Sequence, residues 1–333
     1  MCTENKQLIR CCVVTGPTAS GKTHLAVQLA RRFQGEIISA DSRQVYKGLD
    51  IGSGKDLSEY QSGGKPIRYH LIDVVAPDHE YNVYQYQKDA WQAIQDCHSR
   101  SSLPFLVGGS PLYLSAVLDN YSLEGGEPDP DFRQQLEGQS DRELLTTLQT
   151  RAPDIYQRTD KTQRKRIVRA LEIAEQRDHN QRDGGNKIER ATLNALIIAP
   201  YYERRVIHER IRKRLDERLE AGMLEEIKRL HDWGLSWQQL EFFGLEYGLG
   251  AQYLQGRLTY QQFYEELFKK IRRLCKSQDV WFRKMEREGK VIYWIPEGDV
   301  DEASNLLSDF LSGRQLPDPR IQLKNIYYGP KSQ

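Results

Sequence analysis

The sequence predicts an α/β fold: a P-loop NTPase-like parallel sheet with helices on both faces, plus a helical insertion domain. Short buried strands alternate with helices over about the first 120 residues, which is typical of a parallel sheet. The stretch GPTASGKT at 16–23 follows the first strand and opens a helix, as a phosphate-binding loop does. After about residue 121 the pattern changes to helices alone, until a buried strand returns at 192–200.

Each expected element rests on a local pattern of apolar residues. Strands are expected where a short apolar run ends at a turn residue or an acid, at 8–16, 35–41, 68–75, 103–110, 192–200 and 290–296. Helices are expected where apolar residues recur at helical spacing, at 21–33, 81–100, several between 131 and 180, 204–234 and 260–287. The strand at 192–200 is expected to rejoin the sheet.

The same pass along the chain predicts the domain organisation. Residues 1–121 and 190–310 are expected to form the P-loop α/β core with its C-terminal helices. Residues 122–189 are expected to form the helical insertion domain, and 311–333 a polar tail. A loop rich in Gly, Pro and acids at its start and a polar return at 177–187 mark the insertion.

Composition excludes several classes of protein. The 48 Lys and Arg residues nearly balance the 47 Asp and Glu residues, for a formal net charge of +1, so a globally basic nucleic-acid binder is not indicated. No apolar stretch approaches the roughly 20 residues needed to span a bilayer, and the N-terminus does not resemble a secretory signal. The five cysteines form no C-x-x-C pair, which indicates reduced thiols. We therefore expect a cytoplasmic protein with no membrane partner, and a monomer.

The loop GPTASGKT predicts a phosphate site. Its backbone N–H groups would wrap a pyrophosphate, helped by the dipole of the helix that follows. Lys22 would supply a point charge, and the Thr23 hydroxyl would sit on a phosphate-bound Mg²⁺. The residues of this predicted diphosphate site are Gly16, Pro17, Thr18, Ala19, Ser20, Gly21, Lys22 and Thr23.

Two acids follow expected strands. Asp41 stands at the carboxyl end of the second strand, where open α/β sheets bind their ligands. It could act as a general base or a Mg²⁺ ligand, or it could simply cap the following turn; local sequence favours neither. Asp73 is a weaker, Walker-B-like candidate, for which a structural role or a distant Mg²⁺ contact is favoured over catalysis.

Basic residues are clustered despite the neutral total. The segments 158–170 and 203–218 are both rich in arginine. Such a run usually marks a solvated helix face. It is also what an RNA-phosphate footprint requires, and arginines near a pyrophosphate leaving group would assist its departure.

Taken together, these segments resemble the tRNA dimethylallyltransferase (isopentenyltransferase) family. The similarity runs in family order over about residues 10–285 and includes VVTGPTASGKTHLAVQLA, YHLIDV, RIVRALEI and DVWFRK. The pair GPTASGKT and ISADSRQVYKGLDIG is its most specific part, because ordinary kinases do not carry it.

The resemblance implies transfer of a dimethylallyl group from dimethylallyl diphosphate to N6 of the adenosine 3′ of the tRNA anticodon, with release of diphosphate. It implies that the P-loop and Mg²⁺ hold the diphosphate, that Asp41 accepts the amine proton, and that Arg214, or Arg210 as second choice, lies near the leaving group. Thr23, Asp41 and Arg214 are then the catalytic residues. Contacts to the tRNA anticodon stem-loop are implied at Asp41, Ser42, Arg43, Gln44, Ser110, Arg133, Lys165, Arg166, Ile167, Val168, Arg169, Phe243, Gly244, Glu246 and Tyr247.

Three segments depart from the family pattern, all on the side expected to face RNA. In GGSPLY, Ser110 and Pro111 replace Thr and Gly; in FGLEYG, Glu246 stands where a basic residue is common; and in CKSQ, Ser277 replaces a basic residue. An adenylate isopentenyltransferase acting on free nucleotides, a non-catalytic RNA-binding paralogue and a nucleoside kinase are the alternatives. The insertion and the basic helices favour RNA as acceptor.

Overall fold

A six-stranded, fully parallel sheet forms the centre of the main unit. The structure, a computed structural model, describes residues 8–61, 63–119, 126–182 and 192–326, without the side chains of 178–182. The strand order is β3-β2-β4-β1-β5-β6, so β1 lies between β4 and β5. The strands are β1 (Leu8–Val14), β2 (Gly35–Ser39), β3 (Tyr69–His70), β4 (Leu103–Val107), β5 (Thr192–Tyr201) and β6 (Ile292–Pro296). This confirms the predicted α/β class and the return of 192–200 to the sheet.

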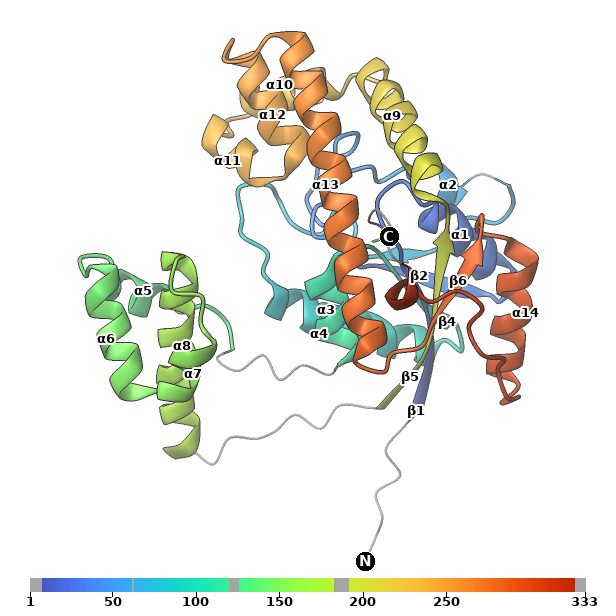
Figure 1. Cartoon of the computed structure of the whole chain (residues 1–333), viewed down its shortest axis with the longest axis horizontal. Helices are drawn as coiled ribbons and strands as arrows, with labels where there is room; N and C mark the ends of the chain where they lie inside the picture. The colour runs from blue at the N-terminus through green and yellow to red at the C-terminus, as the bar shows by residue number, and fades with distance from the viewer. Residues whose placement is uncertain (1–7, 62, 120–125, 183–191, 327–333) are drawn as a thin grey trace, which may run out of the picture. The chain divides into compact units, whose positions relative to one another are not determined.

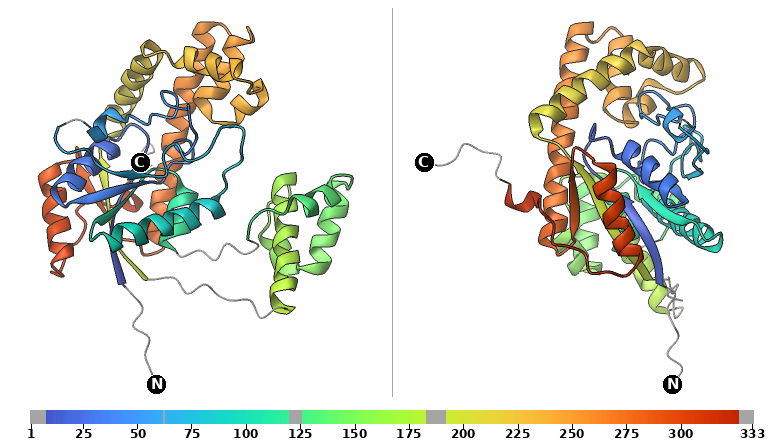
Figure 2. Two further views of the ribbon diagram at one scale, coloured as in Figure 1. Left: turned by 180° about the vertical axis from the view of Figure 1, so that it is seen from behind. Right: turned by 90° about the vertical axis from the view of Figure 1, so that its right-hand side faces the viewer.

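Helices cover both faces of this sheet, as Figure 1 shows with α1 and α14 on one side and α3, α4 and α13 on the other. Cys12 and Val14 of β1 pack in one cluster with α1 and α14, and the alternate residues Cys11 and Val13 are equally buried. A strand buried on both faces explains its continuous apolar run. Figure 2 shows the same arrangement from behind and from the side.

The helices of the main unit follow the strands in chain order. They are α1 (Lys22–Arg32), α2 (Ser58–Gln61), α3 (Val83–Ser99), α4 (Pro111–Leu118), α9 (Arg204–Glu220), α10 (Met223–Asp232), α11 (Trp237–Phe242), α12 (Leu245–Leu254), α13 (Tyr260–Arg287), α14 (Val300–Leu311) and a 3₁₀ turn, η1 (Leu323–Asn325). The expected helix 204–234 is two helices, because Gly222 adopts φ 95° and begins α10.

The expected strand 68–75 is wrong over most of its length. Only Tyr69 and His70 pair with β2, and Val75 makes an isolated bridge to Tyr46. Leu71 and Asp73 have φ values of 61° and 56°, which an extended strand does not allow. Asp73 instead forms an ion pair with Lys55, whose side chain is 1% exposed. The chain turns at Leu71 and Asp73, and the turn brings the Asp73 carboxylate to this buried lysine. The contacts of Asp73 are therefore structural.

The chain divides into two compact units, one within 1–81, 86–118 and 191–333, the other within 82–85 and 119–190. The second unit contains α5 (Pro130–Leu136), α6 (Asp141–Arg151), α7 (Pro153–Arg158) and α8 (Arg164–Arg182). These helices bury their own apolar core, centred on Leu144, Leu148, Ile155 and Ile167. The predicted boundaries at 121/122 and 189/190, residues 183–187 of the expected return and the last seven residues of the tail lie outside the described residues. The expected return is wrong at 177–182, because α8 continues through these residues.

The described cysteines are Cys11, Cys12, Cys97 and Cys275, and all are buried free thiols. Cys97 lies in a polar cluster that ties β2, β3 and the end of α3 together. Arg100 binds the two oxygens of Glu36 through Nε at 3.0 Å and Nη2 at 2.8 Å, and His70 Nε2 lies 2.7 Å from Oε2. Cys97 Sγ is 3.7 Å from the same oxygen.

Glu36→Gln is expected to destabilise the protein by about 3 kcal/mol at pH 7. Burial alone would raise the pKa of Glu36, but the hydrogen bonds from Arg100 and His70 outweigh burial and lower the pKa to about 2. Because this is below the ordinary value of 4.5, the stabilisation is present above that value and is lost as the pH falls toward 2. Urea unfolding at pH 7 and pH 3 should therefore show the gap between wild type and variant shrinking by about 2 kcal/mol. Glu209→Gln, at a site 64% exposed, is the control; a gap independent of pH would contradict the assignment.

Candidate active site

The P-loop joins β1 to α1 and is shaped by two glycines. Gly16 and Gly21 have φ values of 143° and 83°, which favour glycine. A Cβ on Gly16 would lie 2.8 Å from Ser20 Oγ. The sequence GPTASGKT therefore forms the tight loop before a helix that the motif predicts.

Polar groups of this loop are only partly satisfied. Ser20 Oγ is buried and has no hydrogen-bond partner among the described residues. The Thr18 amide donates to Gln278 Oε1 at 2.9 Å, and Gln278 Nε2 donates to the Gly109 carbonyl at 2.9 Å. Lys22 Nζ has a long contact of 3.5 Å to the Pro17 carbonyl. The loop thus offers donors that an anion can take over.

The electrostatics of Lys22 indicate an excess of positive charge. Burial and then repulsion from the Arg214 guanidinium lower the pKa of Lys22, Asp41 raises it, and Arg218 lowers it again, so that the pKa falls to about 8 in all. Bringing an anion to this lysine would relieve the repulsion. The P-loop and the arginines of α9 therefore form one electropositive site.

Asp41 lies where the ends of β2 and β4 meet. Its Oδ1 accepts a hydrogen bond from the Arg43 amide at 2.9 Å, which is the turn-capping geometry. Ser110 Oγ accepts from the Ser42 amide at 3.1 Å. A Cβ on Gly108 would collide with the backbone of Ala40, so the two strand ends need glycine here. The structure thus brings Asp41, Ser42, Arg43 and Ser110 together at one edge of the sheet.

Pro111, one of the departures from the family pattern, has a local explanation. It is the first residue of α4. A first helical position needs no N–H donor and suits the fixed φ of proline. Ser110 keeps its hydroxyl in contact with Ser42, so neither change disturbs the turn at Asp41.

Helix α9 carries arginines on two different sides. Arg210 Nε donates to the Ala19 carbonyl of the P-loop at 2.8 Å, and Arg214 Nη2 binds Asp56 at 2.9 Å. Both Arg214 and Arg218 lie against Gly54, where a Cβ would collide with them. This inner side, Arg210, Arg214 and Arg218, belongs to the P-loop site.

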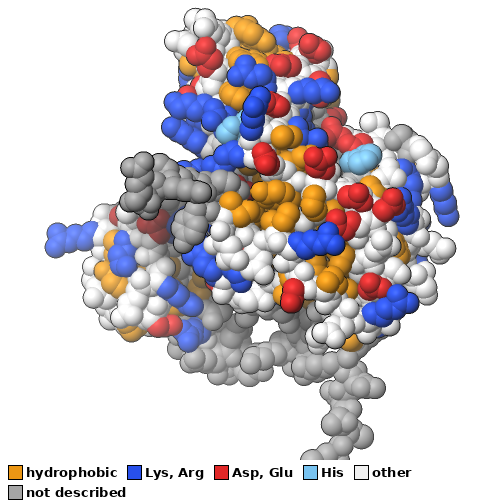
Figure 3. Space-filling view, turned by 45° about the vertical axis from the view of Figure 1, so that its right-hand side comes forward, with side chains coloured by type: hydrophobic (Ala, Val, Ile, Leu, Met, Phe, Trp, Pro, Cys, Tyr) orange, Lys and Arg blue, Asp and Glu red, His pale blue; other side chains and the backbone are white. Residues whose placement is uncertain are grey.

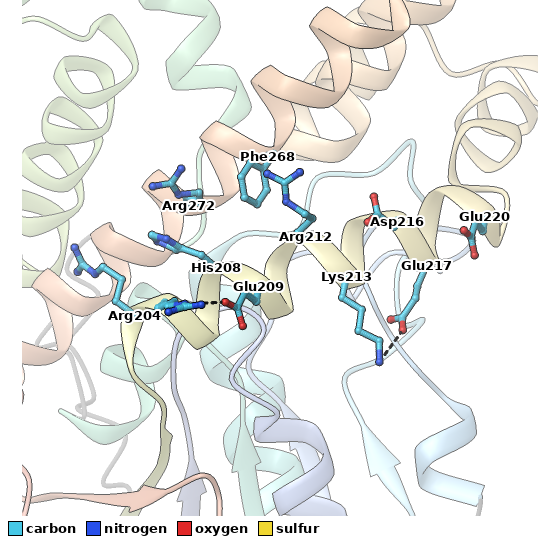
Figure 4. A pocket seen from close by; sticks show the side chains of 11 residues that line it. Arg204, His208, Glu209, Arg212, Lys213, Asp216, Glu217, Glu220, Phe268 and Arg272 are labelled. Carbon is cyan, nitrogen blue, oxygen red and sulfur yellow. Dashed lines mark hydrogen bonds and ion pairs between the residues drawn. The ribbon is translucent and has the colours of Figure 1, made fainter.

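The outer side of α9 lines an open groove of about 910 Å³ with α13 (Figure 4). Much of its charge is neutralised locally: Arg205 binds Glu209 at 3.1 Å and Lys213 binds Glu217 at 3.7 Å. Arg212 and Arg272 both contact the Phe268 ring. On the face shown in Figure 3, basic and acidic side chains are likewise interspersed. The outer side of α9 fits a solvated helix face.

A buried glutamate holds the loop at 50–55. Glu226, 0% exposed, accepts hydrogen bonds from the amides of Asp50, Ile51 and Gly52 at 2.7–3.1 Å and from the Tyr247 hydroxyl at 2.8 Å. Gln44 Nε2 donates to the Gly54 carbonyl at 3.1 Å. The loop is thereby fixed beneath the guanidinium groups of Arg214 and Arg218.

The residues expected to contact tRNA differ in their exposure. Asp41, Ser42, Arg43, Ser110, Gly244 and Glu246 in the main unit and Arg133, Lys165, Arg166, Val168 and Arg169 in the helical unit are exposed or partly exposed. Gln44, Ile167, Phe243 and Tyr247 are at most 9% exposed and pack inside their own units. Arg43 lies over the exposed Phe242 ring at 5.6 Å, a charged and aromatic pair of the kind that RNA bases stack on.

In the helical unit, buried Glu172 organises two of these arginines. Arg133 binds both of its oxygens, at 2.6 and 3.1 Å, and Arg169 binds Oε2 at 3.1 Å. The side chain of Glu172 is 0% exposed. Arg133 and Arg169 are thus held in fixed positions within this unit.

Four residues of the site were not predicted from the sequence. Arg218, Asp56, Glu226 and Gln278 are placed there by contacts between distant segments, such as the bridge from Gln278 to Thr18. Gln278 lies in the segment CKSQ, which the family resemblance already singled out. For Glu226 and Asp56 the sequence offers no signal beyond an acid on a helix or a turn.

Comparison with known proteins decides the family. A model of the family "IPP transferase" matches residues 44–285, and one of "Isopentenyl transferase" matches residues 9–73. The tRNA dimethylallyltransferase 1 of Syntrophus aciditrophicus (strain SB) is 47% identical over 292 residues, which cover 87% of this chain and 94% of that protein. The chain belongs to the tRNA dimethylallyltransferase family.

Further members are similar in sequence and structure. The tRNA dimethylallyltransferase 2 of Citrifermentans bemidjiense is 48% identical over 295 residues, 89% of this chain and 93% of that protein. The full-length tRNA isopentenylpyrophosphate transferase of Bacillus halodurans aligns with a TM-score of 0.64 at 31% identity, over 92% of this chain and 96% of that one. A eukaryotic dimethylallyltransferase acting on tRNA aligns with a TM-score of 0.79 at 25% identity, over 94% and 82%. The family's P-loop fold is therefore the fold of this chain. Among the described residues, no helix is long and apolar enough to cross a membrane.

Proposed function

We propose that this protein transfers a dimethylallyl group from dimethylallyl diphosphate to N6 of the adenosine 3′ of the anticodon in tRNA, releasing diphosphate. The observation that carries the proposal is the electropositive P-loop, with Lys22 and Arg214, beside Asp41 in a member of this family. The P-loop residues Gly16 to Thr23 hold the diphosphate, which leaves as a whole rather than donating a phosphoryl group.

The donor half of the site promotes departure of the diphosphate. An allylic diphosphate ionises readily once the charge on its leaving group is neutralised. Lys22, Arg214 and the loop amides supply that neutralisation, in a position fixed before the reaction begins. Arg210 is already bonded to the Ala19 carbonyl, so its role is to hold the loop against α9.

The acceptor half supplies a base. The adenine amine is a poor nucleophile because its lone pair is delocalised into the ring. Asp41 accepts the amine proton as the C–N bond forms, using Oδ2, because Oδ1 accepts from the Arg43 amide. The target adenine must leave the RNA stack to reach such a site, which favours a single-stranded anticodon loop as substrate.

Magnesium fits the donor atoms of this site. The hydroxyls of Thr23 and Ser20 and the carboxylate of Asp41 are hard oxygen ligands of the kind Mg²⁺ prefers, and Ser20 Oγ is buried with no partner among the described residues. We assign the protein ligand to Thr23. When bound, Mg²⁺ would neutralise charge on the diphosphate.

The tRNA contacts are proposed for exposed and partly exposed residues of both units: Asp41, Ser42, Arg43, Ser110 and Gly244 in the main unit, and Arg133, Lys165, Arg166 and Arg169 in the helical unit. Gln44, Phe243 and Tyr247 support these contacts from beneath, and Ile167 and Val168 pack in or against the core of the helical unit. A monomer acting in the cytoplasm remains our expectation.

Incubation with labelled dimethylallyl diphosphate and either tRNA or AMP tests the proposal. We expect label in tRNA and none in AMP, with diphosphate released in equal amount. Label in AMP alone would show an adenylate isopentenyltransferase. RNA binding with no transfer would show a non-catalytic paralogue, and consumption of ATP labelled at its γ-phosphate would show a kinase.

A further inference from the structure

Arg218 lies two helical turns along α9 from Arg210 and one turn from Arg214, on the same side of the helix. The guanidinium groups of Arg218 and Arg214 both lie against Gly54. Arg218 also lines a small hollow together with Thr18 and Ala19 of the P-loop. Arg218 is therefore a third arginine of α9 that reaches the P-loop site, together with Arg210 and Arg214.

Arg218 is poorly satisfied for a buried cation. Its side chain is 14% exposed, yet Nε has no hydrogen-bond partner among the described residues. Nη1 makes two long contacts, 3.3 Å to the Gly52 carbonyl and 3.5 Å to Glu246 Oε1. A guanidinium carries five donors, and leaving one of them, Nε, without a partner in a largely buried position is unfavourable.

The charges around Arg218 also favour the binding of an anion. Burial lowers the pKa of Arg218, and repulsion from Arg214 lowers it further, with Glu246 opposing both. Lys22 is affected by the same two arginines. Three cations, Lys22, Arg214 and Arg218, converge on the P-loop. Asp56 forms an ion pair with Arg214 and Glu246 forms one with Arg218, whereas Asp41 acts on Lys22 only through space. Among the described residues, Lys22 is therefore the one of these three cations without an ion-pair partner.

The hollow between these groups is about 10 Å³, room for about one water molecule. A diphosphate cannot enter unless a side chain moves. The Arg218–Glu246 contact is the longer of the two ion pairs, 3.5 Å against 2.9 Å for Arg214–Asp56. The Arg218–Glu246 ion pair therefore breaks more easily than the Arg214–Asp56 ion pair.

We propose that Arg218 is a further diphosphate-binding residue of this protein, and that Glu246 is its resting counter-ion, from which Arg218 turns when the diphosphate of the donor binds. The inference rests on the proposed function, because it takes the P-loop ligand to be a diphosphate. Glu246, at the position where the family commonly has a basic residue, then acts on the donor side of the site rather than on tRNA.

The test is titration calorimetry of the full chain with inorganic pyrophosphate and Mg²⁺. Arg218→Met keeps the apolar stem and should raise the Kd about 10-fold or more, because it removes charge-assisted hydrogen bonds. Glu246→Gln frees Arg218 and should lower the Kd about 3-fold, since the ligand no longer competes with the carboxylate. Arg205→Met, on the outer side of α9, is the matched control and should leave the Kd unchanged.

The outcomes separate this inference from the proposed function. Wild type that binds no pyrophosphate would refute both. Wild type that binds while Arg218→Met binds equally well would refute only the role of Arg218. Should Arg218→Met fail to fold, Glu246→Gln alone decides, because a Kd equal to or above that of wild type overturns the inference. Binding of an anticodon stem-loop by Glu246→Gln should stay within about 2-fold of wild type, and a larger change would place Glu246 on the RNA side.

Discussion

Asp41→Asn is expected to lower kcat about 10²-fold or more, the usual scale for loss of a general base. The amide side chain still offers Oδ1 to the Arg43 amide, so the turn at the end of β2 is kept. What is lost is the capacity to take the proton of the adenine amine. Single-turnover transfer to tRNA measures the effect, and binding of the anticodon stem-loop should change little because phosphate contacts dominate its affinity.

Asp41→Ala is the comparison that separates catalysis from turn capping. A residue that only caps the turn would tolerate Asn, which keeps the acceptor, and would be sensitive to Ala, which removes it. If Asp41 is the general base, both substitutions remove it and both variants lose activity. Full activity of Asp41→Asn together with an inactive Asp41→Ala would therefore show that Asp41 shapes the turn and that the proton goes elsewhere.

Arg214→Met is expected to lower kcat by about 10²–10³-fold, the scale observed when one group that stabilises a departing negative charge is removed. The methionine keeps the apolar stem of the side chain but cannot neutralise the leaving diphosphate. Asp56, the resting partner of Arg214, is 42% exposed and is solvated when the arginine is gone, so the fold should persist. Quenched-flow measurement of diphosphate release gives the rate.

Lys213→Met is the matched control for Arg214. Lys213 is the preceding residue of α9, is 79% exposed and pairs only with Glu217 among the described residues. A charge removed there should leave kcat within about 2-fold, because water screens a distant exposed charge. Equal losses in the two variants would indicate a general loss of positive charge rather than a specific role for Arg214.

Local motifs were sufficient to predict the position of the P-loop and of Asp41 in the fold. The P-loop is one continuous segment, and Asp41 closely follows β2, which neighbours β4 in the sheet, so a pattern within a few residues places both. The strand at 68–75 could not be predicted in this way, because Asp73 is drawn to a lysine that lies 18 residues away.

Residues whose role depends on a partner far away in the sequence could not be predicted either. Glu226, in MLEEIKRL, has the sequence of a solvated helix face, and its burial makes sense only beside the amides of 50–52, which are 174–176 residues away. Arg218 resembled the other arginines of α9 until Glu246 and the P-loop were placed around it. Buried charges need partners, and a single sequence does not state which segment supplies them.

The position of β1 in the sheet bears on how the protein is made. β1 is synthesised before the other strands of the sheet, yet its register with β5 joins Leu8 to Thr192 and Val14 to Ile198. A nascent chain that has completed β4 and even the helical unit still exposes one edge of its central, apolar strand. Open strand edges are where chains associate wrongly. Premature termination before residue 192 should therefore yield an aggregation-prone fragment even though its P-loop is complete, and the growing chain is most in need of protection while the helical unit emerges.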